Sequence, residues 1–251
     1  MATGPQQKRK ELRDKRLKAE AQSKGSDRRQ GLAKIVGIAA FLAVVAIAVF
    51  AYISTTGNDE PTREASEVNK LLEGIPQSGN VLGEPDAPVT LVEFADLQCP
   101  ACKTASEEII PDVINGPVTN GTAKYEFQNW PILGDDSVIA AKAALAAQEQ
   151  GRLQQFVENF YADQGFEGSG YVDDDFLRGI AEKAEIPDLD KWEADRDLPK
   201  WDQVLLKVDN EASDAGFSGT PSFAIRNADG SLAQIDATSA DDIIQAINQA
   251  R

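Results

Sequence analysis

The chain has 251 residues, of which 42% are hydrophobic, and this composition supports a folded core and excludes a wholly disordered protein. Its formal net charge of −16 is divided unevenly, because residues 1–34 carry 11 Lys and Arg against 4 Asp and Glu, a balance of +7 that leaves −23 for the rest. An acidic domain after residue 34 argues against binding to the phosphates of nucleic acids.

An uninterrupted apolar run follows the basic segment, from Ile35 to Ile53. At about 1.5 Å per residue this run extends roughly 28 Å, close to the hydrocarbon thickness of a bilayer, and it predicts one transmembrane helix in contact with membrane lipid. The Lys and Arg excess before it predicts a cytoplasmic N-terminus and an extracytoplasmic remainder. A cleaved signal peptide is the alternative, but the long basic region favours an uncleaved anchor, and it also favours a topological role over a nucleic-acid patch.

The segment 54–80 is polar and interrupted by Gly and Pro, and we expect it to be an extracytoplasmic linker with one short helix. The folded domain is then expected over 81–251. A short strand at Val81 precedes a turn, and the apolar run Val89 to Ala95 predicts a central strand that is covered on both faces.

Helices and strands alternate in the rest of the domain. A helix is predicted from Pro100 to Val113, kinked or ended at Pro111, followed by a strand at 123–130 and an alanine-rich helix at 137–151. Further amphipathic stripes predict a block of helices that reaches about residue 216. A hairpin is predicted from Pro221 to Ile235, with its turn at Asp229-Gly230, and a last helix over 241–250.

The only two cysteines, Cys99 and Cys102, lie at the end of the predicted central strand. Zinc needs about four Cys or His ligands, but the chain has no histidine and no other cysteine. A structural disulfide over so short a loop restricts the unfolded chain little. These arguments favour a thiol redox pair.

The position of Cys99 suits such chemistry, since a helix that begins at Pro100 directs its free backbone N–H groups toward the preceding sulfur. We therefore expect a lowered pKa for Cys99, which would be the attacking thiol. Cys102 lies one turn further into the helix, and we expect it to be the less exposed, resolving thiol.

Two stretches together resemble the DsbA-type proteins of the thioredoxin superfamily. "EFADLQCPAC" resembles their active-site stretch, and "GFSGTPSFAI" is similar to the superfamily's cis-proline loop. The resemblance covers about 81–251 and implies an α/β thioredoxin-like fold with a helical insertion at about 136–216. It also implies a cis Thr220-Pro221 bond, with the backbone of Thr220 beside the Cys99 sulfur.

The resemblance further implies a thiol:disulfide oxidoreductase whose redox carrier is the Cys99–Cys102 disulfide, with no separate cofactor and no metal. Pro100 and Ala101 between the cysteines, together with Thr220, are the expected substrate-binding residues. Pro100-Ala101 replaces a dipeptide that contains histidine in the best-known DsbA, and Thr220 also precedes the cis-proline in isomerases, so the direction of electron flow stays open.

Glu93 interrupts the apolar strand six residues before Cys99, and the resemblance implies a buried acid that assists proton transfer for the resolving thiol. The alternative is an exposed glutamate at a sheet edge. Asp96 is expected to order the loop, Trp130 to pack in the core, and Asp173 to Asp175 to cap a helix.

The leading functional hypothesis is a monomeric, membrane-tethered oxidase of reduced secreted or membrane proteins. A quinone-linked membrane reoxidase resembling DsbB or a vitamin K epoxide reductase homologue would restore its disulfide. A disulfide reductase or isomerase of the same fold is the second hypothesis, and a non-enzymatic extracytoplasmic binding module is the third.

Overall fold

The computed structural model describes residues 63–251, which form an α/β domain around one mixed sheet. The strands are β1 (Gln77–Ser78), β2 (Val81–Leu82), β3 (Val89–Ala95), β4 (Ala123–Asn129), β5 (Ser222–Arg226) and β6 (Leu232–Ile235). They lie in the order β1-β2-β4-β3-β5-β6, so that β3 is central. β3 pairs in parallel with β4 and antiparallel with β5, and the pairing with β5 places the cysteine motif beside the cis-proline loop.

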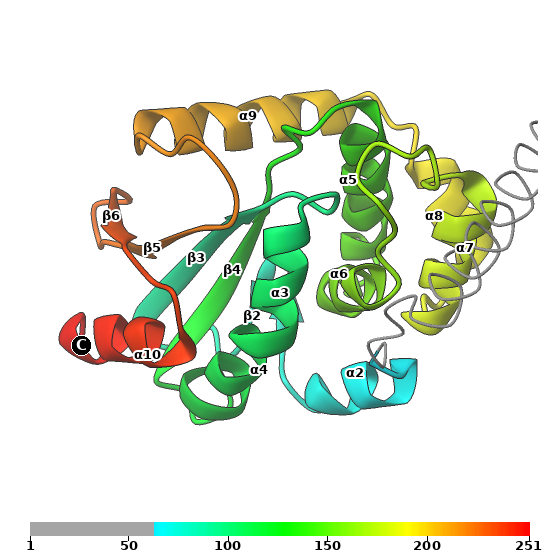
Figure 1. Cartoon of the computed structure of the whole chain (residues 1–251). Coiled ribbons are helices and arrows are strands. Elements are labelled where there is room, and N and C mark those ends of the chain that lie inside the picture. Colours follow the sequence, from blue (N-terminus) through cyan, green and yellow to red (C-terminus); the bar gives the residue numbers. More distant parts are fainter. Residues whose placement is uncertain (1–62) are drawn as a thin grey trace, which may run out of the picture. The chain divides into compact units, whose positions relative to one another are not determined.

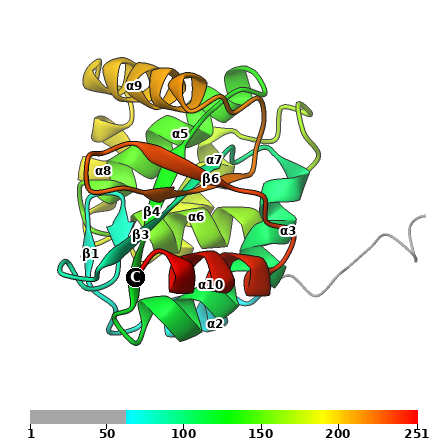
Figure 2. The ribbon, with the colours of Figure 1, turned by 90° about the vertical axis from the view of Figure 1, so that its left-hand side faces the viewer.

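The helices cover both faces of this sheet. They are α2 (Ala65–Leu71), α3 (Pro100–Glu108), α4 (Ile110–Val113), α5 (Asp135–Gln148), α6 (Leu153–Ala162), α7 (Asp174–Lys183), α8 (Leu189–Asp195), α9 (Lys200–Asp214) and α10 (Ala240–Gln249), with a π-helical turn η1 at Ile114–Val118. α9 lies along one side, and α3, α4 and α10 lie on the other (Figure 1). The view from the side shows the hairpin of β5 and β6 between α9 and α10 (Figure 2).

The central strand β3 follows the predicted bounds and directs alternate side chains to opposite faces. Val92 and Phe94 pack with Trp130 under α9, whereas Leu91 and Ala95 belong to the larger core under α3 and α6. Glu93 lies between Leu91 and Ala95 in this alternation. The period of the strand therefore puts the Glu93 side chain on the same face as the helix that carries the cysteines.

Several local predictions are confirmed. The long helix predicted from Pro100 is interrupted at Ile109, because Pro111 has no N–H to continue the hydrogen bonding of α3. The turn between β5 and β6 contains Gly230 at a φ of 88°, a conformation that glycine adopts without steric cost. The helices α5 to α9 lie between β4 and β5, in the place of the predicted helical insertion.

The predicted linker is wrong in its second half. α2 and β1 lie within 54–80, yet Val68 and Leu72 are almost completely buried in the main core, and β1 pairs with β2. The one short helix expected here is present as α2, but its packing against the domain was not predicted, because only its few apolar side chains contact the core. The ordered domain thus begins before the predicted start at Val81.

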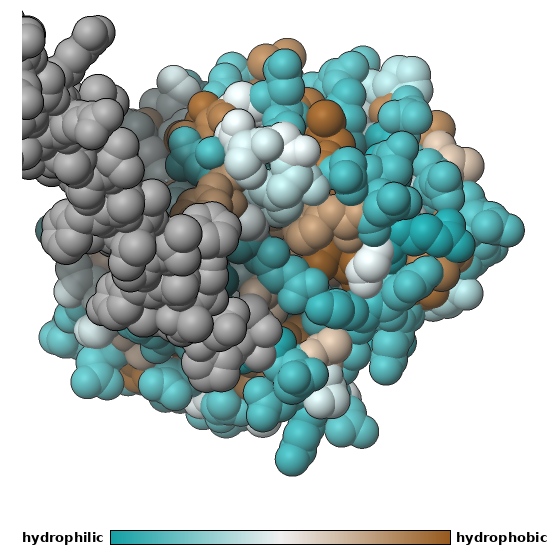
Figure 3. Space-filling view, turned by 45° about the vertical axis from the view of Figure 1, so that its right-hand side comes forward, coloured by the Kyte–Doolittle hydropathy of each residue, from teal (hydrophilic) through white to brown (hydrophobic). Residues whose placement is uncertain are grey.

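The predicted transmembrane span at 35–53 lies outside the described residues. Over 63–251, no helix is both long enough and apolar enough to cross a bilayer. On the face seen in Figure 3, hydrophilic side chains predominate among the described residues, with smaller apolar patches between them.

Replacing Leu72 with Ala tests the assignment of α2 to the domain. Leu72 is 2% exposed, so the cavity should lower the free energy of unfolding by about 2 to 4 kcal/mol in urea titrations. Ser66→Ala, at an exposed position of the same helix, is the matched control and should change stability little. Equal stability of the Leu72 variant and the parent protein would contradict the assignment.

Candidate active site

The cysteine pair lies at the N-terminus of α3, as predicted. Cys99 is the N-cap residue with extended backbone geometry, and Pro100 occupies the first turn. Both cysteines are free thiols, and Cys99 retains 7% exposure while Cys102 retains none. The reactive edge of the pair is therefore Cys99, with Cys102 beneath it.

The surroundings of Cys99 favour its thiolate form. Together they lower the pKa of Cys99 to about 6, and the largest influence is a hydrogen bond from the Cys102 thiol, which acts against the opposing effect of burial. Thr220 and the backbone N–H groups of Ala101 and Cys102 add to the lowering. The helix N-terminus thus contributes as the sequence predicted, but the neighbouring thiol contributes more.

Cys102 has the opposite environment. Burial first, and then its hydrogen bond to Cys99 and the charge of Glu93, raise the pKa of Cys102 far above its ordinary value. The two thiols therefore differ strongly in acidity although they are only one helical turn apart. One is suited to exist as a thiolate and the other to hold a proton.

The cis-proline loop, which precedes β5, contacts the cysteine motif that follows β3. The Thr220-Pro221 bond is cis, as predicted, and the Cys99 Sγ lies 3.4 Å from the carbonyl oxygen of Thr220. Pro221 directly precedes β5, whose pairing with β3 brings the two motifs together across more than one hundred residues of sequence. The backbone of Thr220 therefore lies beside the Cys99 sulfur, as the resemblance implied.

Glu93 is buried at 2% exposure on the central strand, so the alternative of an exposed glutamate at a sheet edge is wrong. Burial raises the pKa of Glu93 to about 8, against a hydrogen bond from the Tyr125 hydroxyl that lowers it. The charges of Glu158 and Cys99 raise it further. A carboxyl group with this proton affinity can both donate and accept a proton near neutral pH.

The other three predictions about nearby residues are also confirmed by contacts. Asp96 is fully buried and accepts hydrogen bonds from the backbone N–H groups of Gln98, Ile132 and Leu133, so it orders two loops. Trp130 packs edge-on against Phe94 in the core. Asp173 caps α7 by accepting from the N–H of Phe176.

The helical insertion holds the cysteine loop through residues that the sequence did not reveal. The Gln164 side chain donates to the carbonyl oxygens of Leu97, at 2.7 Å, and Cys99, at 3.2 Å. Gln98 donates to the Tyr171 hydroxyl at 2.8 Å. No local pattern marks Gln164 or Tyr171, because their relevance depends on where the insertion folds back.

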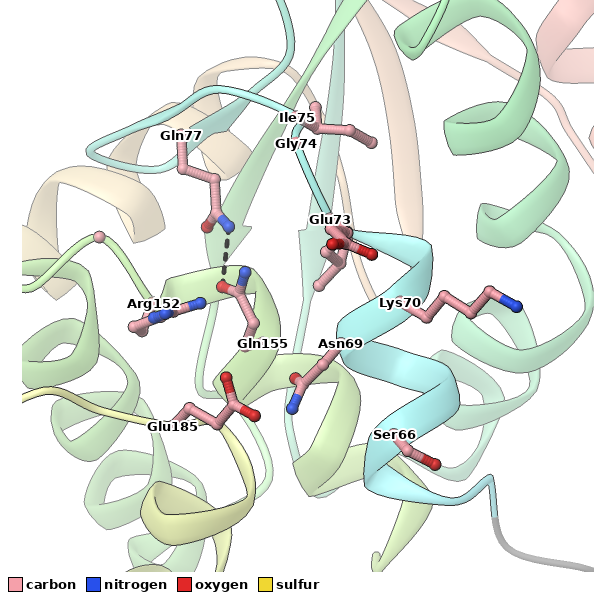
Figure 4. A pocket seen from close by; sticks show the side chains of 12 residues that line it. Ser66, Asn69, Lys70, Glu73, Gly74, Ile75, Gln77, Arg152, Gln155 and Glu185 are labelled. Carbon is pink, nitrogen blue, oxygen red and sulfur yellow. Dashed lines mark hydrogen bonds between the residues drawn. The ribbon is translucent and has the colours of Figure 1, made fainter.

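A hollow lies away from the cysteines, between α2 and the start of α6 (Figure 4). Its volume is about 740 Å³, and Lys70, Glu73, Arg152 and Glu185 are among the charged side chains that line it. None of its lining residues belongs to the cysteine motif or to the cis-proline loop. The redox chemistry therefore occurs at the surface around Cys99 and not in this hollow.

A low-pKa thiol at a helix N-terminus, a protonated partner thiol and an adjacent cis-proline define the thiol:disulfide oxidoreductases of the thioredoxin superfamily. Comparison with known proteins supports the same class. The family model described as thioredoxin matches residues 77–247. The chain is 28% identical to the probable disulfide bond formation protein D of Bacillus cereus over 197 residues, which cover 77% of this chain and 88% of that protein.

Solved structures agree on the fold. Oxidised BdbD from Bacillus subtilis has a TM-score of 0.61 at 23% identity, covering 70% of this chain and 96% of that one. A thioredoxin-like oxidoreductase from Silicibacter pomeroyi has a TM-score of 0.56 at 28% identity, covering 73% and 96%. The chain belongs to the thioredoxin family and is a DsbA-like thiol:disulfide oxidoreductase.

The contribution of Cys102 to the acidity of Cys99 can be measured directly. In reduced Cys102→Ala, loss of the donated hydrogen bond should raise the pKa of Cys99 from about 6 toward its ordinary value, measured by thiolate absorbance. Cys102→Ser retains a hydroxyl donor and should show a smaller rise. An unchanged pKa in the Ala variant would assign the acidity of Cys99 to Thr220 and the helix N-terminus, and not to Cys102.

Proposed function

We propose that this protein is a membrane-tethered, extracytoplasmic disulfide oxidase, which donates the Cys99–Cys102 disulfide to reduced secreted or membrane proteins. The observation that carries the proposal is the stabilised thiolate of Cys99. With a pKa of about 6, roughly ten thiolates exist for each thiol at pH 7. A stabilised reduced form makes the corresponding disulfide more oxidising.

The reaction begins when a substrate thiolate attacks the Cys99 sulfur of the enzyme disulfide. A mixed disulfide forms, the Cys99–Cys102 bond breaks, and Cys102 leaves with the electron pair and takes a proton from Glu93. A second substrate thiolate then attacks the substrate sulfur of the mixed disulfide. The substrate disulfide closes, and Cys99 departs as the stabilised thiolate.

Exposed apolar side chains near the cysteine loop support an unfolded polypeptide as the substrate. Phe166 is 89% exposed on a loop that is held to the active-site loop through Gln164 and through the bond from the N–H of Gly168 to Gln98. Ile132, also exposed, donates its own backbone N–H to the Asp96 carboxylate of the active-site loop. Unfolded chains present apolar segments that such side chains can contact.

The membrane location rests on the amino-acid sequence. The apolar run 35–53 and the basic residues before it support an N-in anchor, which would place Cys99 outside the cytoplasm, where disulfides persist. Pro100, Ala101, Thr220 and Pro221 would contact the substrate beside the sulfur. The redox carrier is the cysteine pair itself, the protein works as a monomer, and a quinone-linked membrane reoxidase resembling DsbB or a vitamin K epoxide reductase homologue would renew the disulfide.

A disulfide reductase or isomerase is the second candidate, since Thr220 precedes the cis-proline. The two candidates differ in the state of the enzyme that meets the substrate. An oxidase must be disulfide-bonded in the cell, whereas a reductase or isomerase must be kept as the dithiol. The redox state of the cellular enzyme after acid quenching separates them.

Trapping tests the proposal in cells. In Cys102→Ala, the Cys99 thiolate should attack disulfides of secreted proteins, the reverse of the last proposed step, and release one substrate thiolate; the mixed disulfide should accumulate, because the second enzyme thiol that would otherwise resolve it is absent. Non-reducing gels after acid quenching would reveal the adducts, and Cys99→Ala is the matched control that should form none. The absence of adducts with Cys102→Ala would contradict the oxidase and favour a non-enzymatic binding module.

A further inference from the structure

A second carboxyl group lies buried near Glu93, and the proposed reaction does not use it. Glu158 of α6 is 2% exposed. Its carboxylate accepts hydrogen bonds from the Ser106 hydroxyl at 2.7 Å, from the Gln154 amide at 2.9 Å and from the Arg63 guanidinium at 3.2 Å. Three donors and one positive charge are the conditions under which a carboxylate can be buried.

The side chains of Tyr125 and Gln154 connect Glu158 to Glu93. The Tyr125 hydroxyl of β4 donates to Glu93, and the Gln154 side chain interacts with both Tyr125 and Glu158. Gln154 is itself held by the bond from its backbone N–H to the Gln77 side chain. The two acids therefore belong to one buried polar cluster, at a separation that lets the charge of one act on the other.

The cluster has one basic member. The titratable groups that face Glu93 are Tyr125 from β4, Glu158 and Tyr161 from α6, and the two thiols of the cysteine motif. Arg63 contacts Glu158 and the carbonyl oxygen of Ser106, and its side chain is 19% exposed. Its charge is thus directed at Glu158 and not at Glu93.

We propose that Glu158, which is paired with Arg63, is a positioning residue whose negative charge keeps the proton on Glu93. This inference rests on the proposed role of Glu93 as the acid and base for Cys102. The charge of Glu158 indeed raises the pKa of Glu93, and Arg63 lowers the pKa of Glu158 against the larger effect of burial.

The arrangement favours one direction of proton transfer. When substrate attacks the enzyme disulfide, a protonated Glu93 can give its proton to the departing Cys102. When a dithiol enzyme is reoxidised, Glu93 must first be ionised so that it can accept the proton of the Cys102 thiol. Glu158 therefore assists substrate oxidation at neutral pH. It slows ring closure, the step in which Cys102 attacks Cys99 and re-forms the Cys99–Cys102 disulfide.

Ring closure with glutathione disulfide provides the test. Reduced full-length enzyme attacks glutathione disulfide through Cys99 and releases one glutathione thiolate. Cys102 then passes its proton to Glu93 and attacks Cys99, which breaks the mixed disulfide and releases the second glutathione thiolate. The rate of this second step, followed from pH 6 to 9, should rise as Glu93 ionises, with a midpoint near its pKa of about 8.

Glu158→Gln should lower that midpoint by about one pH unit, because it removes a neighbouring negative charge. At pH 7 the ionised fraction of Glu93, and with it the closure rate, should rise about fivefold. A lost structural contact would instead slow closure at every pH. Thermal unfolding and thiolate absorbance should also be recorded for Glu158→Gln. If the variant is folded and the pKa of Cys99 is unchanged, the change in closure rate can be assigned to Glu93.

Arg63 variants give an independent test that does not require the Glu158 variant to fold. Arg63→Gln should shift the midpoint in the same direction, because Glu158 without its counter-ion takes up a proton, and the double variant with Glu158→Gln should add nothing. Arg63→Lys retains the charge and should behave like the parent protein. An upward shift in Arg63→Gln, or additive shifts, would overturn the assignment of Arg63.

Glu93→Gln separates this inference from the function on which it rests. If closure in Glu93→Gln is slow and independent of pH, Glu93 is the base, and an unshifted midpoint in Glu158→Gln overturns the role of Glu158 alone. If Glu93→Gln retains the pH dependence of the parent protein, the role of Glu93 is wrong, and the proposal for Glu158 is overturned with it.

Discussion

The unequal proton affinity of two neighbouring thiols is the constraint on which this site depends. Cys99 lies where hydrogen-bond donors converge, and Cys102 lies where burial and a nearby acid disfavour negative charge. The break between β3 and α3 creates both environments at once, because the first residue of a helix meets free N–H groups while the next turn enters the core. A single helix start thus provides the nucleophile and its protonated partner.

The remainder of the domain holds this helix start in place. β3 positions Glu93 below the cysteines, β5 presents Thr220 and Pro221 beside them, and the insertion secures the preceding loop through Gln164. The buried acid that suits proton transfer is tolerated because Tyr125 satisfies it. The chemistry therefore uses contributions from segments that are far apart in the sequence but adjacent in the sheet.

Local features of this arrangement could be predicted from the sequence, whereas long-range contacts could not. The bounds of β3 and the helix start at Pro100 follow from strand character and from the proline, whereas the cis bond at Thr220-Pro221 and the burial of Glu93 were implied by the resemblance to DsbA-type proteins. Two contacts had no such signal. The short helix α2 was expected, but the burial of Val68 and Leu72 against the domain was not, and Glu158 is one polar residue on a helix whose neighbours are decided by the tertiary fold.

The reduction potential of the Cys99–Cys102 pair tests most directly whether thiolate stabilisation makes this enzyme an oxidant. Equilibration with glutathione at pH 7, followed by acid quenching and separation of the two forms, would give it. A stabilised thiolate predicts a potential above about −200 mV, well above the roughly −270 mV of thioredoxin. A value at or below that of thioredoxin would contradict the account and make the protein a reductant.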